Sequence, residues 1–156
     1  MQFKVSEHVR KVLALVLVAG FAALALSLSP GAASASSPRS GELHVTKECS
    51  AYTGAAGDFC TITSSNLAAI TVGSTVTYAR AVDAPAQQLD SNIVLDGGGG
   101  NTAVGHCRVS LVTWIGQCTF SGGTGTLTGF HARAAVSPLG GPNFAWDGTY
   151  SFSPPN

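Results

Sequence analysis

From about residue 43 onward, short runs of β-forming residues alternate with clusters of turn residues, and this pattern leaves few choices of fold. The segments "TVTYARAV" (75–82) and "NIVLD" (92–96) have the composition of strands. Loop-like segments follow them, "DAPAQQLDS" after the first and "GGGGN" after the second. No helical period lasts for long, and turn signals return roughly every 8–12 residues. The sequence therefore predicts about eight strands in an all-β barrel or sandwich.

The first 35 residues have the layout of a secretory signal peptide. A start that contains Lys and Arg precedes the apolar run 12–29, and a helix-breaking Pro-Gly pair follows it. Small residues then suit cleavage between Ala35 and Ser36. No cysteine near this point could carry a lipid. The sequence therefore predicts a secreted or otherwise extracytoplasmic product that leaves by the general export route.

A single membrane anchor is the alternative to cleavage. The apolar run is at the short edge for spanning a bilayer, and the cleavage signal favours its removal. No stable membrane anchor is then expected in the mature chain. We expect residues 36–42 to be a flexible leader and residues 43–156 to form one β-barrel domain.

Charge is scarce, because Asp, Glu, Lys and Arg together make up 10% of the chain. Three of the eight basic residues and one of the eight acidic residues lie in the signal segment, which leaves five basic and seven acidic residues. No basic patch is visible, so nucleic acid and anionic membranes are excluded as expected partners. A small apolar molecule remains as a candidate partner, and no cofactor is expected.

The four cysteines all lie beyond the expected signal peptide, and they could stabilise the fold as disulfides. They are Cys49, Cys60, Cys107 and Cys118. An even number in an exported chain predicts two disulfides, for which three connectivities are possible. The two sequence-local pairs are favoured because each spans the same short separation. A zinc site is the competing interpretation, but neither pair has the spacing of metal ligands, so no metal is expected.

The glycine-rich stretch "SGGTGTLTGFHARAAVS" (121–137) could be a phosphate loop or a hairpin. A phosphate loop needs a following lysine and helix, and neither is present. A hairpin turn at 122–125 is therefore favoured, since glycine supplies the positive φ that such turns use. In the strand after this turn, alternation places Phe130, Ala132, Ala134 and Val136 on one face.

The segments "CTFSGGTG" (118–125) and "GGPNFAWDGTYSF" (140–152), with "GGTGTLTGF" between them, resemble the exported bacterial branch of the allene oxide cyclase-like and dirigent-like barrels. The resemblance is clearest over residues 107–152, and "CTITSSN" and "LDSNIVLD" fit the same branch. It implies a closed eight-stranded antiparallel barrel around an apolar cavity. The plant members act on or orient small hydrophobic molecules, namely a fatty-acid epoxide or phenoxy radicals.

Two functions follow from these observations. The favoured one is non-catalytic: a secreted, disulfide-stabilised barrel that binds or shields a small hydrophobic molecule. The alternative is an isomerase like the allene oxide cyclases, or a dirigent-like protein that guides the cyclisation or coupling of a reactive intermediate. The catalytic acid, asparagine and cysteine of the plant cyclases have no matching positions, so no catalytic residue is carried over. A module that binds another protein is a third possibility.

Aromatic residues near the carboxyl terminus are the candidates for a ligand cavity. Phe144, Trp146 and Tyr150 share one parity with Phe152, and this face should point into the barrel. Phe130 and Tyr78 complete the candidate set. The alternative is that these side chains simply fill the core.

A second candidate cavity is polar. His106 and Arg108 share one face of the expected strand 104–112, and Cys107 and Val109 share the other. We expect the apolar face to be inside, which leaves His106 and Arg108 in solvent. If they pointed inward instead, a buried pair beside Asp90 or Asp96 would form a polar site.

Overall fold

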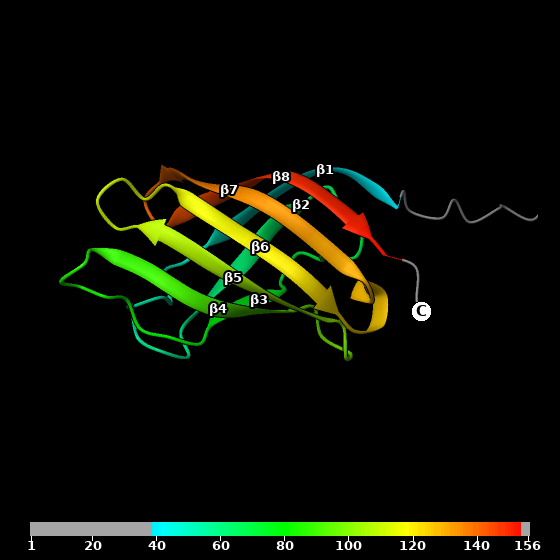
Figure 1. Ribbon diagram of the computed structural model, residues 1–156, viewed down its shortest axis with the longest axis horizontal. Coiled ribbons are helices and arrows are strands. Elements are labelled where there is room, and N and C mark those ends of the chain that lie inside the picture. The colour runs from blue at the N-terminus through cyan, green and yellow to red at the C-terminus, as the bar shows by residue number, and fades with distance from the viewer. Residues whose placement is uncertain (1–38, 154–156) are drawn as a thin grey trace, which may run out of the picture. The chain divides into compact units, whose positions relative to one another are not determined.

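A computed structural model describes residues 39–153, which form one closed β-barrel (Figure 1). The expected signal peptide, residues 1–35, lies outside the described residues. The strands are β1 (Ser40–Glu48), β2 (Phe59–Ser65), β3 (Thr75–Tyr78), β4 (Gln88–Asp96), β5 (Thr102–Ser110), β6 (Gly116–Gly123), β7 (Phe130–Gly140) and β8 (Asn143–Phe152). No helix in this part of the chain is long and apolar enough to cross a membrane.

The strands follow one another around the barrel in sequence order, and every neighbouring pair is antiparallel. Pairing of β1 with β8, from Ser40 opposite Ser151 to Glu48 opposite Asn143, closes the sheet. The eight-stranded antiparallel barrel expected from the sequence is thus confirmed, and the sandwich is excluded. β1 begins at Ser40, so the last part of the segment expected to be a flexible leader belongs to the barrel.

Alternation along the strands separates the core from the surface. On β7, Phe130, Ala132, Ala134 and Val136 are buried while the residues between them are exposed, as the sequence predicts. On β8, Trp146 is fully buried, and Asp147 beside it is exposed. The interior of an eight-stranded barrel is narrow enough for side chains to fill it, and here the inward-facing residues form a single packed core.

Two glycines allow strands to approach each other more closely than other residues would. A Cβ atom at Gly148 in β8 would overlap the carbonyl oxygen of Arg133 in β7. A Cβ at Gly105 in β5 would overlap the carbonyl oxygen of Thr119 in β6. Glycine at these points therefore lets the sheet bend tightly enough to close.

The glycine-rich connection between β6 and β7 is longer than the hairpin expected from its sequence. β6 continues to Gly123, a short 3-10 turn covers Gly125–Leu127, and β7 starts only at Phe130. The hairpin at 122–125 is therefore corrected to a turn centred further along the chain. The physical reason is Leu127, which is completely buried and holds the 3-10 turn against the core at this end of the barrel.

Both disulfides join neighbouring strands in the sequence-local pairing that the spacing favoured. Cys49 at the end of β1 is bonded to Cys60 in β2, and Cys107 in β5 is bonded to Cys118 directly opposite it in β6. Each links residues 11 positions apart. In a chain-entropy model, a disulfide that closes a loop of this length stabilises the folded state by about 3 kcal/mol, because it restricts the unfolded chain.

Candidate functional site

A small pocket lies inside one end of the barrel, where four connections gather (49–58, 79–87, 111–115 and 141–142). This end of the barrel is at the left in Figure 1. The volume of the pocket is about 40 Å³. The lining is mostly apolar and contains three polar groups. The lining residues are Lys47, Cys49, Tyr52, Cys60, Tyr78, Leu89, Val109, Leu111, Trp114, Val136 and Phe144.

Lys47 is the central polar residue of the pocket, and only 3% of it is exposed. Its position follows from the alternation of β1, in which Leu43, Val45 and Lys47 all point inward. An irregularity in the pairing of β1 with β2 falls between Thr46 and Lys47. The strand continues past it with the lysine side chain still directed into the barrel.

The amine of Lys47 has one hydrogen-bond partner among the described residues. Nζ donates to the hydroxyl of Tyr78 at 2.5 Å. The same atom lies 4.4 Å from the ring centroid of Trp146 and 5.2 Å from that of Tyr78, which are cation–π distances. The buried polar side chains in the described part of the chain are Lys47, Ser74 and Ser91, so no buried carboxylate neutralises the amine. Burial therefore lowers the pKa of Lys47 to about 7.

Two tyrosines complete the polar part of the pocket, with ring centroids 4.9 Å apart. The hydroxyl of Tyr78 lies 3.9 Å from Cys60 Sγ and can donate to it, because a disulfide sulfur carries no proton. Burial raises the pKa of Tyr78. The hydroxyl of Tyr52 is buried and has no partner among the described residues. Its pKa is raised by burial and then by the charge of Asp58.

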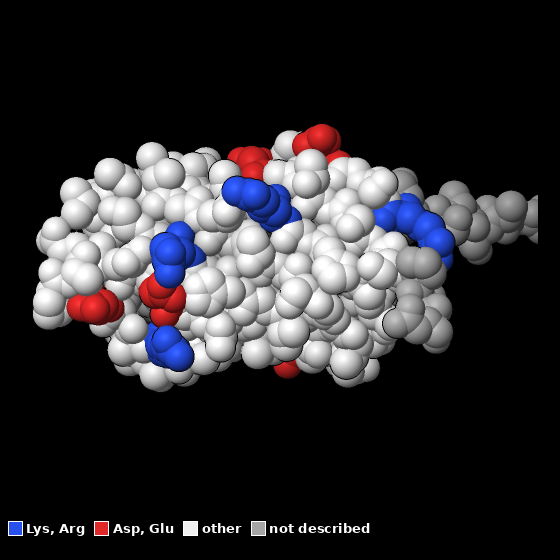
Figure 2. Space-filling model, in the orientation of Figure 1, with Lys and Arg blue, Asp and Glu red and all other residues white. Residues whose placement is uncertain are grey.

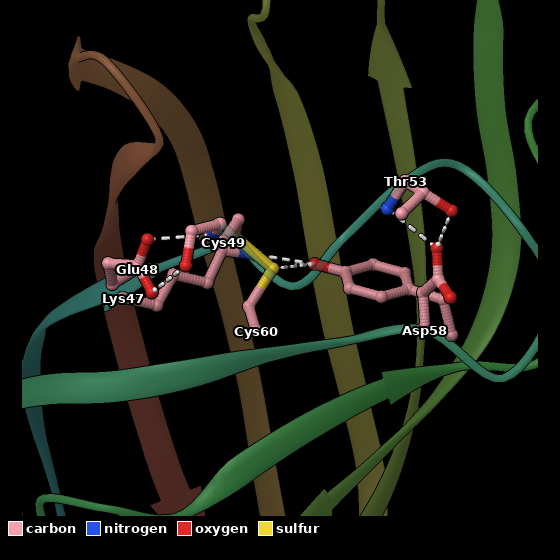
Figure 3. Close-up of a disulfide and its surroundings, with 8 residues drawn as sticks. Lys47, Glu48, Cys49, Thr53, Asp58 and Cys60 are labelled. Atoms are coloured by element: carbon pink, nitrogen blue, oxygen red, sulfur yellow. Dashed lines mark hydrogen bonds between the residues drawn. A yellow bond between two sulfur atoms is a disulfide. The ribbon is translucent and has the colours of Figure 1, made fainter.

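The connection from β1 to β2 holds this arrangement in place, as Figure 3 shows around the disulfide. The carboxylate of Asp58 accepts hydrogen bonds from the backbone and hydroxyl of Thr53 and from the Ala55 backbone. These bonds, the Thr53 hydroxyl first, lower the pKa of Asp58. Glu48 accepts from the backbone and hydroxyl of Ser50 instead of pairing with the neighbouring lysine. Both carboxylates thus bind groups of the loop, and neither pairs with the amine of Lys47.

The outer edge of the pocket is apolar. Trp114 and Phe144 line it and are partly exposed, and their ring centroids lie 6.0 Å apart. Val112 and Ile115, in the connection 111–115, and Leu139, near the end of β7, are large exposed hydrophobic residues at this same end of the barrel. Trp114 has a φ of 58°, which is uncommon for a residue with a bulky side chain. Residues with such backbone conformations are found more often at functional sites than elsewhere. We call these five residues the apolar rim.

The aromatic residues predicted to line a cavity fall into two groups. Tyr78 and Phe144 line the pocket, and Trp146 lies under the amine of Lys47. Phe130 and Tyr150 do not line it. Both are packed in the core beside Phe152, with ring centroids 5.4 and 5.9 Å from it. The structure thus divides the predicted set between pocket and filled core.

The alternative polar cavity does not form, because His106 and Arg108 point outward. On the outer face, Arg108 donates to Asp90 from Nε at 2.9 Å and from Nη2 at 2.5 Å. His106 Nε2 lies 3.0 Å from the same carboxylate. The bond from Arg108 is the main cause of the lowered pKa of Asp90. Because side chains alternate along β5, the Cys107–Cys118 disulfide lies on the inner face. Figure 2 shows that the charged side chains on the face in view are few and scattered.

Sequence reasoning missed Lys47, although a signal was present. Leu43 and Val45 alternate with polar residues, and the continuation of this alternation places Lys47 on the same inward face. Lys47 is also the single lysine after residue 35. A lone lysine in register with core positions indicates a buried amine, which is rarely found without a partner.

Comparisons with known proteins identify no relative. No family model matches the chain, and no curated protein and no solved structure matches it either. Residues 39–153 contain no group of three or more His, Cys, Asp or Glu side chains that could hold a metal ion. The functional argument therefore rests on the pocket around Lys47.

Proposed function

We propose that the protein is an exported, disulfide-stabilised barrel that binds a small apolar molecule in the pocket around Lys47. One observation carries the proposal. An apolar pocket contains a buried amine with a single partner and a buried tyrosine hydroxyl with none. Because buried polar groups are costly when unpaired, a ligand with a polar end would satisfy them. The apolar rim would then accommodate the rest of the molecule.

The size of the pocket limits what can bind. Sites for drug-sized molecules commonly measure about 300–1,000 Å³, whereas this pocket measures about 40 Å³. It encloses the polar end of a ligand and a few carbon atoms, and the remainder would lie on the rim. Guided cyclisation would require the whole reactant to be enclosed. That alternative stays a prediction from the resemblance to allene oxide cyclase-like and dirigent-like barrels.

Export is part of the proposal and is supported by the two disulfides, which persist in oxidising compartments. Expression of the full chain in a secreting host, followed by mass measurement of the released protein, tests it. A product that begins at Ser36 is expected. A released product that retains residues 1–35 would contradict cleavage, and absence of the protein from the medium would contradict the export proposal.

Tryptophan fluorescence provides the test of binding. In a Trp114→Phe variant the remaining tryptophan is Trp146, which lies under the amine of Lys47. We expect a saturable change in its emission on titration with butan-1-ol or butanal. An Arg108→Ala variant in the same background is the control, because Arg108 lies on the outer face and should not alter the response. If none of these probes produces a saturable change, the binding proposal is refuted.

A further inference from the structure

We propose that Lys47 binds small apolar aldehydes covalently, as a reversible imine between its Nζ atom and the carbonyl carbon. This inference rests on the proposed ligand pocket and specifies the chemistry of its polar end. The geometry that supports it is a buried amine held by Tyr78, with apolar walls on the remaining sides.

An amine reacts with a carbonyl group only when it is unprotonated, and the pocket favours that form. The described part of the chain contains no buried carboxylate that could pair with Lys47, and burial lowers the pKa of Lys47 to about 7. The ionisable groups that face it across the pocket are Tyr52 and Tyr78, whose pKa values are raised. Both tyrosines are therefore neutral near pH 7, when a substantial fraction of the lysine is neutral as well.

The same arrangement favours an aldehyde over a carboxylate. A carboxylate would bring a second charge into an apolar space, which is costly unless it is fully hydrogen-bonded. The available donors are the amine and the two tyrosine hydroxyls. An aldehyde brings no charge, and its single oxygen needs fewer donors. When the imine is protonated, its positive charge occupies the position of the present ammonium, over the ring of Trp146.

The reaction balances without an oxidant or reductant. The lone pair of Nζ attacks the carbonyl carbon, a C–N bond forms, and the oxygen takes up the proton lost by nitrogen. The carbon–oxygen bond of this carbinolamine then breaks, the leaving hydroxyl takes up the second proton of the nitrogen, and water departs as the C=N bond forms. The hydroxyl of Tyr78, already 2.5 Å from Nζ, is placed to pass the proton between nitrogen and oxygen. We therefore assign Tyr78 the role of proton carrier.

The experiment uses the mature protein, butanal as the probe, and cyanoborohydride to reduce any imine to a stable secondary amine. Because Lys47 is the single lysine after residue 35, peptide mass mapping distinguishes its modification from that of the α-amine of the chain. The measured quantity is the ratio of Lys47 to α-amine labelling, in folded protein and in concentrated urea. We expect folding to raise this ratio about tenfold or more at pH 7, since an unperturbed lysine is almost fully protonated there.

Two variants locate the chemistry. Lys47→Met should abolish labelling at this position and leave the α-amine unchanged. Tyr78→Phe retains the amine and should slow labelling by roughly 100-fold, the lower range for a lost acid–base group. The dependence of wild-type labelling on pH should have a midpoint near the pKa of Lys47, about 7. A purely structural role for Lys47 would not give this profile.

Several results would overturn the inference. A ratio that is equal or lower in folded protein would do so, and so would a Tyr78→Phe variant that labels as fast as wild type. If butan-1-ol changes the fluorescence of Trp146 while butanal leaves Lys47 unlabelled, the imine is wrong and the binding proposal stands. If neither probe changes the fluorescence and no label appears, both proposals fail.

Discussion

Replacing Lys47 by methionine should stabilise the protein at neutral pH and change how its stability depends on pH. Methionine retains a flexible side chain of similar length and removes the amine. Replacing a buried charge by an apolar side chain of similar volume is often neutral or stabilising. Here the amine has no buried carboxylate partner among the described residues, so little favourable interaction is lost.

The magnitude follows from the pKa of Lys47, which burial lowers from 10.5 to about 7. Between these two values the unfolded chain binds more protons than the folded one. The free energy of unfolding of the wild type therefore rises with pH, by up to roughly 1.4 kcal/mol per pH unit. From pH 7.5 to 9 this term adds about 2 kcal/mol. Below pH 7 both states are protonated, so the full cost of burying the charge is present there.

The pH dependence is tested by urea unfolding of the wild type and of Lys47→Met at pH 7.5 and 9, with tryptophan fluorescence as the signal. The described cysteines are all paired, so the disulfides stay intact without added oxidant. The wild type should gain about 2 kcal/mol relative to Lys47→Met between the two pH values. If the free energies of unfolding of the two proteins change in parallel, Lys47 is not a buried, partly neutral amine, and the reasoning is refuted.

Three further predictions concern the scaffold. Gly148→Ala should destabilise the barrel by roughly 1–3 kcal/mol in urea unfolding, because its Cβ would overlap the backbone of β7; Ser151→Ala, at an exposed position of the same strand, is the control and should be nearly neutral. Replacing both Cys107 and Cys118 by alanine should lower the thermal stability by an amount equivalent to about 3 kcal/mol, and an unchanged midpoint in calorimetry would contradict this. Arg108→Ala should leave both the unfolding midpoint and ligand binding unchanged, because its ion pair with Asp90 lies on the outer face; a loss of binding in the fluorescence titration would contradict that placement.

Much of the barrel could be predicted from the sequence, because strand periodicity is a local property. The alternation around Phe130 and Val136, and around Trp146, placed those side chains inside the barrel correctly. The same reasoning placed His106 and Arg108 in solvent. The sequence-local disulfide pairing also followed from spacing, since neighbouring antiparallel strands bring residues at such separations together.

Other features depend on contacts that local patterns do not contain. The turn after β6 was placed too early, because burial of Leu127 at the end of the barrel, and not glycine content, determines where the chain reverses. Lys47, Tyr52 and Trp114 were missed as pocket residues, because Trp114 is distant in sequence from the other two and lines the same pocket only in the folded barrel. The absence of a carboxylate beside Lys47, and of any partner for the Tyr52 hydroxyl among the described residues, could be recognised only after their neighbours were known.

The pairing of β1 with β8 also has a consequence for how the chain folds. β1 must find β2 nearby in the sequence and β8 about a hundred residues away, as in the contact between His44 and Asp147, which are 103 positions apart. Closing so long a loop is entropically unfavourable, and non-local pairing slows folding. Until that last seam forms, the growing sheet has two open edges, each able to recruit a strand from another molecule. Ring closure therefore removes the edges through which the nascent barrel could aggregate, and it also completes the environment of Lys47, because Trp146 lies on β8.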